Sequence, residues 1–291
     1  MRIKPAALES LSRDMFLEGR KLSKKRETRR FRMLLGASFK TIAKLWNMLE
    51  PKRNISRRAQ PKHILWTMVC LKVSRTDKVH CTILKVKDEK TLRFWVEKFI
   101  CGIASLETEV IVFGNRLQGW RGNTSCLMSI DGTDVKCKEP QPYNPIWWSL
   151  KHNSAGLRYE VGICIKTGDI VWFNGPFPCN MSDREIFDLC LSKKLAPFEK
   201  VEADNGYKGR AQIYLPGQGK NHRDRKQKSQ VRGRHENVNG LFKVFGAMKK
   251  WESNNVAKHG IIAKAVAVIV QTSFSLGQRL YEVDYDVDYD N

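Results

Sequence analysis

Two aspartates and a glutamate beyond residue 125 of this 291-residue chain have the chemistry of a divalent-metal site. Asp131 ends the apolar run 126–130, Asp204 ends a shorter apolar run, and Glu236 lies further along the chain. Carboxylate oxygens suit Mg²⁺ and Mn²⁺, and both ions accept phosphate oxygens in their open positions. Two such ions roughly 4 Å apart activate a water or a 3′-hydroxyl and stabilise the leaving oxygen of an in-line phosphoryl displacement. The three acids therefore predict phosphodiester chemistry, provided that the fold brings them together.

Each assignment has an alternative. Asp131 could form a turn, because an acid at the end of a buried strand is either a turn former or a ligand. Asp134 could take its place, but residues three apart in a strand point to opposite faces, and we prefer Asp131. Glu252 could replace Glu236, although it falls on the apolar side of its expected helix and is better interpreted as a solvated helix end.

Neighbouring residues are equally ambiguous. His235 could contact phosphate or a water at the scissile bond, or it could cap a helix. Trp147 and Trp148 could stack on unpaired bases, but we favour a packed corner of the core.

The elements that must position the acids alternate between strands and helices. A buried strand over 126–130 leads to Asp131, where Gly132 breaks the apolar run. The other expected elements are a β-hairpin over 159–165 and 169–173, a helix over 182–195, a strand over 200–203, a helix from 233–236 to about 251 and a buried helix over 258–276. Between them, the basic segment 208–235 is interpreted as a loop over an anion rather than a disordered linker. This order predicts an α/β fold whose mixed sheet is flanked by helices.

The convergence of the acids depends on two conditions. Asp131 and Asp204 lie side by side if the first and fourth strands are neighbours. Glu236 heads its expected helix, on the side opposite the apolar face, and joins them only if that helix overhangs the sheet edge.

Composition narrows the class of protein. A net charge of +22 and a pI of about 9.8 point to a polyanionic partner, most often nucleic acid. The 42% of hydrophobic residues can supply a real core. We expect no secretory signal and no membrane span, because the longest apolar stretch, 260–276, is interrupted by polar residues. The eight scattered cysteines are expected to be reduced, as in a nuclear or cytosolic protein.

Positive charge is concentrated at the N-terminus. Residues 1–62 hold eighteen Lys or Arg against five acids, and the segment 20–32 is the densest part. This run could be a nuclear-import signal, a phosphate-binding arm or a solvated helix face. Helical periodicity predicts helices over 39–49 and 61–71, and a helix-turn-helix outline over 78–106, with Thr91 as the N-cap of its second helix. The residues expected to bind DNA are Lys24, Lys25, Arg26, Arg29, Arg30, Arg232 and Arg234.

These motifs resemble those of the DDE superfamily endonucleases, and in particular the PIF/Harbinger-type transposases. The resemblance covers roughly residues 125–275 and rests on four pieces: Asp131-Gly-Thr, the segment 151–186, Asp204-Asn-Gly-Tyr, and RHENVN over 234–239 with Phe242 and Phe245. The second piece departs from the family pattern, reading PCNMSDRE where a Gly-Ser more usually precedes the Asp. Residues 208–230 form an unusual basic insertion.

The resemblance implies an RNase H-like catalytic domain over 120–280, a basic helical region over 1–110 and an acidic tail over 281–291, expected to be disordered. It also implies that Asp131, Asp204 and Glu236 are the catalytic residues and bind two Mg²⁺ or Mn²⁺ ions. The implied activity is cutting transposon ends and joining them to target DNA in the nucleus. A Myb-like partner and a homo-oligomer are further implications. The alternative function is a domesticated, catalytically inactive DNA-binding protein descended from such an enzyme.

Overall fold

A computed structural model describes residues 2–50, 58–118, 125–218, 222–253, 255–278, 280–283 and 285. The chain divides into two compact units. The first contains Met1–Val110, Phe242–Lys249 and Ile261–Gln278, and the second contains Ile111–Leu241, Lys250–Gly260 and Arg279–Asn291. Most of the expected acidic tail over 281–291 lies outside the described residues.

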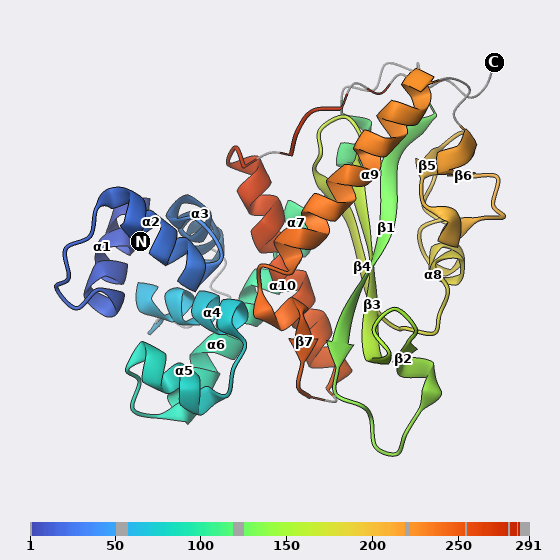
Figure 1. Cartoon of the computed structure of the whole chain (residues 1–291). Helices are drawn as coiled ribbons and strands as arrows, with labels where there is room; N and C mark the ends of the chain where they lie inside the picture. Colours follow the sequence, from blue (N-terminus) through green and yellow to red (C-terminus); the bar gives the residue numbers. More distant parts are fainter. Residues whose placement is uncertain are drawn as a thin grey trace. The chain divides into compact units, whose positions relative to one another are not determined.

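The first unit is built from helices (Figure 1). They are α1 (Pro5–Phe16), α2 (Lys24–Leu35), α3 (Phe39–Leu49), α4 (Pro61–Val73), α5 (Asp77–Leu84), α6 (Glu89–Ala104) and α7 (Glu107–Val110), joined by most of α10 (Val256–Ser275). Helix α4 is buried along most of its length, with Ile64, Leu65 and Met68 fully covered. A helix that is apolar around its circumference must lie at the centre of a bundle, and α4 packs against α2, α3 and α6.

Local signals explain where these helices begin and end. The expected helices over 39–49 and 61–71 are confirmed as α3 and α4, with Ser38 capping α3 and Pro61 in the first turn of α4. The N-cap of α6 is Asp88 rather than Thr91, so that prediction was wrong. The Asp88 carboxylate accepts hydrogen bonds from the backbone nitrogens of Lys90 and Thr91, because an ionised carboxylate satisfies the free N–H groups of a first turn.

The second unit is organised around a mixed sheet. Its strands are β1 (Cys126–Cys137), β2 (Trp148–Ser149), β3 (Ser154–Cys164), β4 (Ile170–Pro178), β5 (Lys200–Glu202), β6 (Ile213–Tyr214) and β7 (Lys250–Trp251). Strand β3 pairs antiparallel with β4, which confirms the expected hairpin, and also with β1. On its other edge β1 pairs parallel with β5 and β7, and β5 pairs parallel with β6. The second unit therefore has the mixed α/β sheet that the sequence predicts.

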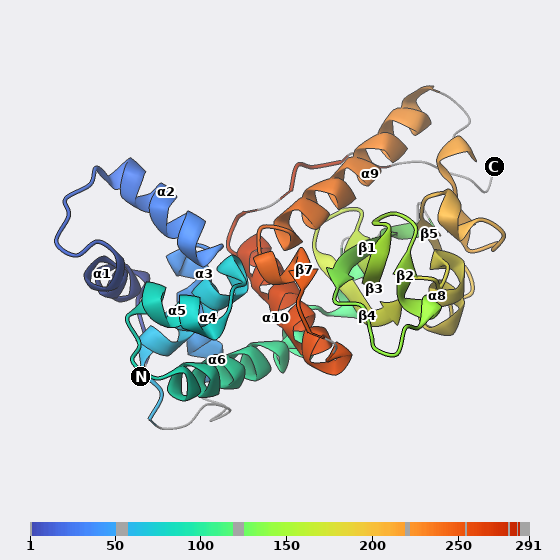
Figure 2. The same ribbon diagram turned by 60° about the horizontal axis from the view of Figure 1, so that its bottom comes forward.

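Helices α8 (Asp183–Leu189) and α9 (His222–Phe242) flank this sheet. Both views place them on opposite sides of the strands (Figure 1, Figure 2). Phe187 of α8 packs with Met128 and Ile130 of β1, while α9 approaches the alternate residues Ser129 and Asp131. Successive side chains of a strand point to opposite faces, so Asp131 faces α9.

Three sequence expectations about the elements of the second unit were wrong. Strand β1 does not end at Asp131 but continues through Gly132 to Cys137, because β3 pairs with it as far as Lys136. Segment 208–235 is not a loop throughout: α9 begins at His222, so Glu236 lies well inside the helix instead of heading it. Helix α9 also ends at Phe242 rather than near Trp251, and a 3-10 turn, η5 (Gly246–Met248), follows.

Candidate active site

Asp131 lies in β1 with its carboxylate between the backbone and α9. One carboxylate oxygen, Oδ1, accepts a hydrogen bond from the Gly132 nitrogen at 2.8 Å. The other, Oδ2, accepts from Nδ2 of Asn239 at 3.1 Å. Burial, followed by the negative charge of Asp204, raises the pKa of Asp131 to about 6. The site therefore destabilises the ionised carboxylate when no cation is present.

Asp204 reaches Asp131 through the parallel pairing of β1 and β5. Ser129 pairs with Glu202, so the two strands run side by side toward the two aspartates. After β5 the chain turns through η3 (Asn205–Tyr207), and Asp204 caps this turn by accepting from the Gly206 nitrogen at 2.8 Å. The sequence condition that the first and fourth strands be neighbours is met, because β5 is the fourth main strand of the expected order.

A third aspartate, Asp183, approaches the same pair from the start of α8. A Cβ placed on Gly132 would stand 2.9 Å from its Oδ1, and one on Gly206 would stand 2.6 Å from its Oδ2 and 3.0 Å from Oδ1 of Asp204. Both glycines therefore make room for the carboxylates. Burial raises the pKa of Asp183, and the charge of Arg158 opposes that rise.

Arg158 joins Asp183 to Asp134. Its Nε and Nη2 donate to the two oxygens of Asp134 at 2.8 and 3.0 Å, and Nη1 donates to Asp183 at 3.2 Å. Asp134 is buried and also accepts from the Ser149 hydroxyl. An acid can occupy a buried strand when it is paired in this bidentate way. Asp134 is thus engaged within the protein, whereas Asp131 faces the other acids.

Helix α9 supplies polar contacts to the face of β1 that carries Ser129 and Asp131. His235 is buried, and its Nε2 forms a 2.8 Å hydrogen bond with the Ser129 hydroxyl. Burial lowers the pKa of His235 to about 4, so the ring is neutral at pH 7. This differs from both sequence interpretations of His235, as a phosphate contact and as a helix cap. Glu236 follows on the exposed surface of α9, one turn before Asn239.

The acids have the donor chemistry of a magnesium or manganese site, although their arrangement is incomplete. Asp131, Asp204 and Asp183 offer hard carboxylate oxygens whose mutual repulsion a cation would relieve. Across the residues that the structure describes, no group of three or more His, Cys, Asp or Glu side chains has an arrangement that could hold a metal ion. Asp131 and Asp204 come together, while Glu236 stays outside this group.

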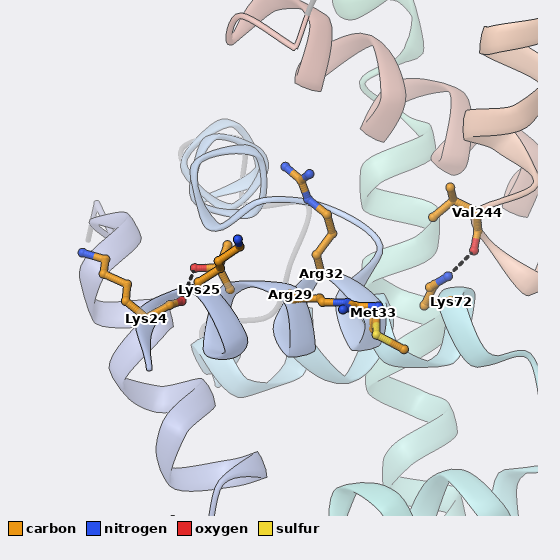
Figure 3. Close-up of a pocket in the computed structure, with 8 residues that line it drawn as sticks. Lys24, Lys25, Arg29, Arg32, Met33, Lys72 and Val244 are labelled. Atoms are coloured by element: carbon orange, nitrogen blue, oxygen red, sulfur yellow. Dashed lines mark hydrogen bonds between the residues drawn. The ribbon is translucent and has the colours of Figure 1, made fainter. Parts of the chain in front are cut away.

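The basic residues expected to bind DNA occupy different environments. Lys24, Lys25, Arg26, Arg29 and Arg30 are all exposed on α2. Glu27, the acid within this run, is buried and pairs with Arg13, so it does not neutralise the outer face. Helix α2 also lines a cavity of about 590 Å³, together with Lys72 of α4, whose Nζ donates to the Val244 carbonyl at 2.7 Å (Figure 3). The first-unit residues lining it carry several positive charges.

The two arginines of α9 differ from each other. Arg232 is exposed. Arg234 is only 2% exposed, and its guanidinium donates to the backbone carbonyls of Ile165 and Tyr281. The expectation that Arg234 contacts DNA does not fit this placement, because its donors are used inside the second unit.

Comparison with known families agrees with this geometry. Residues 130–271 match a family model described as DDE superfamily endonuclease. The match supports the superfamily for this part of the chain. No curated protein and no solved structure matches the chain. Among the described residues, no helix has both the length and the apolar character needed to cross a membrane. The DDE match begins at the end of the apolar run of β1 and includes all three predicted catalytic acids.

Several residues of the site were not identified from the sequence. Asp183 had a signal, since the family resemblance contains an Asp in this block. The sequence gives no signal for the roles of Asn239 and Arg158, because their hydrogen-bond partners lie 108 and 24 residues away. Glu160 is buried beside the acids, and burial raises its pKa to about 7.

Proposed function

We propose that this protein is a metal-dependent DNA endonuclease and strand transferase that cuts transposon ends and joins them to target DNA. The observation that carries the proposal is the parallel pairing of β1 and β5, which places Asp131 beside Asp204, where the chain leaves β5. Strand ends are where mixed α/β sheets bind ligands. The DDE superfamily match over residues 130–271 supports a nuclease with DNA as its substrate.

Two Mg²⁺ or Mn²⁺ ions are the proposed cofactors, held by Asp131 and Asp204 and by Glu236, whose role as the third ligand rests on the motif resemblance. When bound, such ions supply an activated nucleophile and stabilise the leaving oxygen. The residues of the chain have separate tasks. Asn239 fixes Oδ2 of Asp131 by hydrogen bonding, and His235 ties α9 to Ser129 in the same strand. These two contacts hold the helix that carries Glu236 against β1.

DNA contacts are proposed for two surfaces. The exposed basic residues of α2 are suited to phosphate groups, because Lys and Arg that neutralise phosphates release counterions. Arg232 is suited to a phosphate near the acids, since it is exposed on the helix that carries Glu236. We further propose an RNase H-like fold for the catalytic domain, a PIF/Harbinger-type relationship, nuclear action, a Myb-like partner and a homo-oligomeric state. These rest on the motif resemblance.

A catalytically inactive DNA-binding protein is the second candidate. It is favoured by one observation, that no three acids of the described chain converge as metal ligands. The two candidates share the basic surfaces and differ in whether a metal completes the acid site.

Cleavage of supercoiled plasmid in Mg²⁺ or Mn²⁺ separates them. The parent protein should nick the plasmid, and chelation should stop the reaction. Asp131→Asn, Asp204→Asn and Glu236→Gln should each reduce cleavage on the order of a thousandfold or more, because each removes a charge that retains metal. Glu252→Gln is the matched control for Glu236→Gln, since the Glu252 side chain is 70% exposed and forms a surface ion pair with Lys250. Equal cleavage by Glu236→Gln and the parent would refute the three-acid assignment.

A further inference from the structure

A cavity of about 480 Å³ opens in the second unit between two loops. One loop leads from β1 to β3, and contributes Tyr143, Pro145, Trp148 and Leu150. The other follows β4, and contributes Cys179 and Asn180. The Asn180 nitrogen donates to the Ile146 carbonyl at 3.1 Å, which joins the two loops. The cavity thus has a fixed wall on each side, and its volume suits a ligand of nucleotide size.

Apolar and aromatic side chains at the cavity are left open to solvent. Tyr143 is 60% exposed and Leu150 is 92% exposed, while Trp148 is partly exposed. The backbone of Trp148 is held in β2 by pairing with Ala155 of β3. Apolar surface that the protein leaves uncovered in this way is typical of a binding site. Flat aromatic side chains favour a flat aromatic ligand.

The cavity adjoins the acid site. Arg158 lines it and also donates to Asp183, and Ser182, the residue before Asp183, is part of its wall. Lys151 lines the rim, and its positive charge acts on both Asp131 and Asp183. A ligand in the cavity would therefore lie beside any phosphodiester bound at Asp131.

We propose that this cavity binds an unpaired nucleobase of the DNA strand next to the phosphate that is cut, with the base stacked on Tyr143 and Trp148. The inference rests on the proposed nuclease function and adds a base-binding site to it. Lys151 is placed to accept the phosphate of the same nucleotide. The guanidinium of Arg158 is engaged by Asp134, Asp183 and the Met181 carbonyl, so it shapes the wall without being the phosphate ligand.

An apolar peptide would be the competing occupant of such a surface. Two observations favour the nucleobase: the adjacency of the acids, and the cationic rim supplied by Lys151 in a chain of net charge +22. Aromatic stacking on bases is tolerant of sequence, so the proposal does not depend on a particular DNA end.

Photo-crosslinking tests the site without cleavage. The full-length protein is mixed, in EDTA, with a single-stranded oligonucleotide that carries one 5-iododeoxyuridine, and the mixture is irradiated. Peptide mass spectrometry then identifies the crosslinked residue. The crosslink should fall on Tyr143 or Trp148. A crosslink confined to other residues would overturn the proposal. Because EDTA removes the metal, the outcome does not depend on nuclease activity, which the plasmid assay measures separately.

Binding variants give the second readout. Tyr143→Ala should weaken binding of the oligonucleotide about tenfold, within the range expected for loss of one stacked base. Trp148→Phe should retain most of the affinity, because it keeps an aromatic face. The control is Phe94→Ala, which removes a 50% exposed aromatic side chain from the first unit. Unchanged affinity in Tyr143→Ala, or an equal loss in Phe94→Ala, would contradict a base-binding role. Competition by an apolar peptide but not by DNA would assign the cavity to a protein partner.

Discussion

Replacing Asp131 by asparagine should stabilise the metal-free protein at pH 8 while abolishing cleavage. The folded protein raises the pKa of Asp131 from 3.8 to about 6, chiefly through burial and the charge of Asp204. A group whose folded pKa is raised holds its proton more tightly in the folded state. Between pH 3.8 and about 6 the folded protein therefore binds more protons than the unfolded chain, and the stability falls as the pH rises.

The size of the effect follows from the shift. A difference of about 2 pKa units corresponds to about 3 kcal/mol of free energy, at 1.36 kcal/mol per unit. Solvent screening reduces this upper value, since Asp131 is only partly buried, and we expect a gain of about 1–2 kcal/mol in Asp131→Asn. Asparagine keeps an oxygen that can accept from the Gly132 nitrogen or from Asn239, so the hydrogen bonding of the site is largely retained.

Urea unfolding at pH 4 and pH 8, in EDTA and in Mg²⁺, measures this prediction. The gain should appear at pH 8 in EDTA, shrink at pH 4, where the parent carboxyl is protonated when folded, and shrink again in Mg²⁺, which stabilises only the parent. Asp188→Asn is the control, because Asp188 forms a surface ion pair with Arg210 and exposed pairs contribute little. A gain of equal size at both pH values would refute the electrostatic explanation.

Four further outcomes are expected. Changing Lys24, Lys25, Arg26, Arg29 and Arg30 to glutamine should flatten the dependence of log K on log salt by about 0.9 per lost phosphate contact, whereas Lys40→Gln with Lys44→Gln on α3 should leave the slope unchanged. Glu160→Gln should raise the free energy of unfolding above pH 7 by up to about 3 kcal/mol, because burial raises the pKa of Glu160 from 4.5 to about 7. The parent protein loses stability as the pH rises through that interval, and urea unfolding as a function of pH checks this. Asp134→Asn should destabilise the fold by up to about 3 kcal/mol in thermal or urea unfolding, because it removes the charge that pairs with the partly buried Arg158. Replacing Arg232 with glutamine should reduce plasmid cleavage more than DNA binding, and equal losses in both assays would instead make it a general phosphate contact.

The sequence predicted the elements whose apolar pattern determines their packing. Strand β1 is recognisable from the run CLMSI, and α10 from its alanine and β-branched residues, because burial of these faces dominates their stability. The neighbourhood of Asp131 and Asp204 was predictable in the same way, since it needs only parallel pairing of two buried strands. The end of β1 was not predictable. An acid such as Asp134 indicates an exposed segment unless its partner Arg158, on another strand, is known.

The start of helix α9 was also not predicted, because the side chains that this helix buries are polar. Its first half is rich in Lys, Arg and Gln, which favours a loop or a solvated helix when the sequence is considered alone. Within the structure, Lys228 is 1% exposed and pairs with Glu202, and Arg234 and His235 are buried against backbone and hydroxyl groups. Polar residues can cover a sheet face when each finds a partner there, and those partners are distant in sequence. The helix that carries Glu236 is therefore positioned by polar contacts that binary hydrophobic patterning cannot detect.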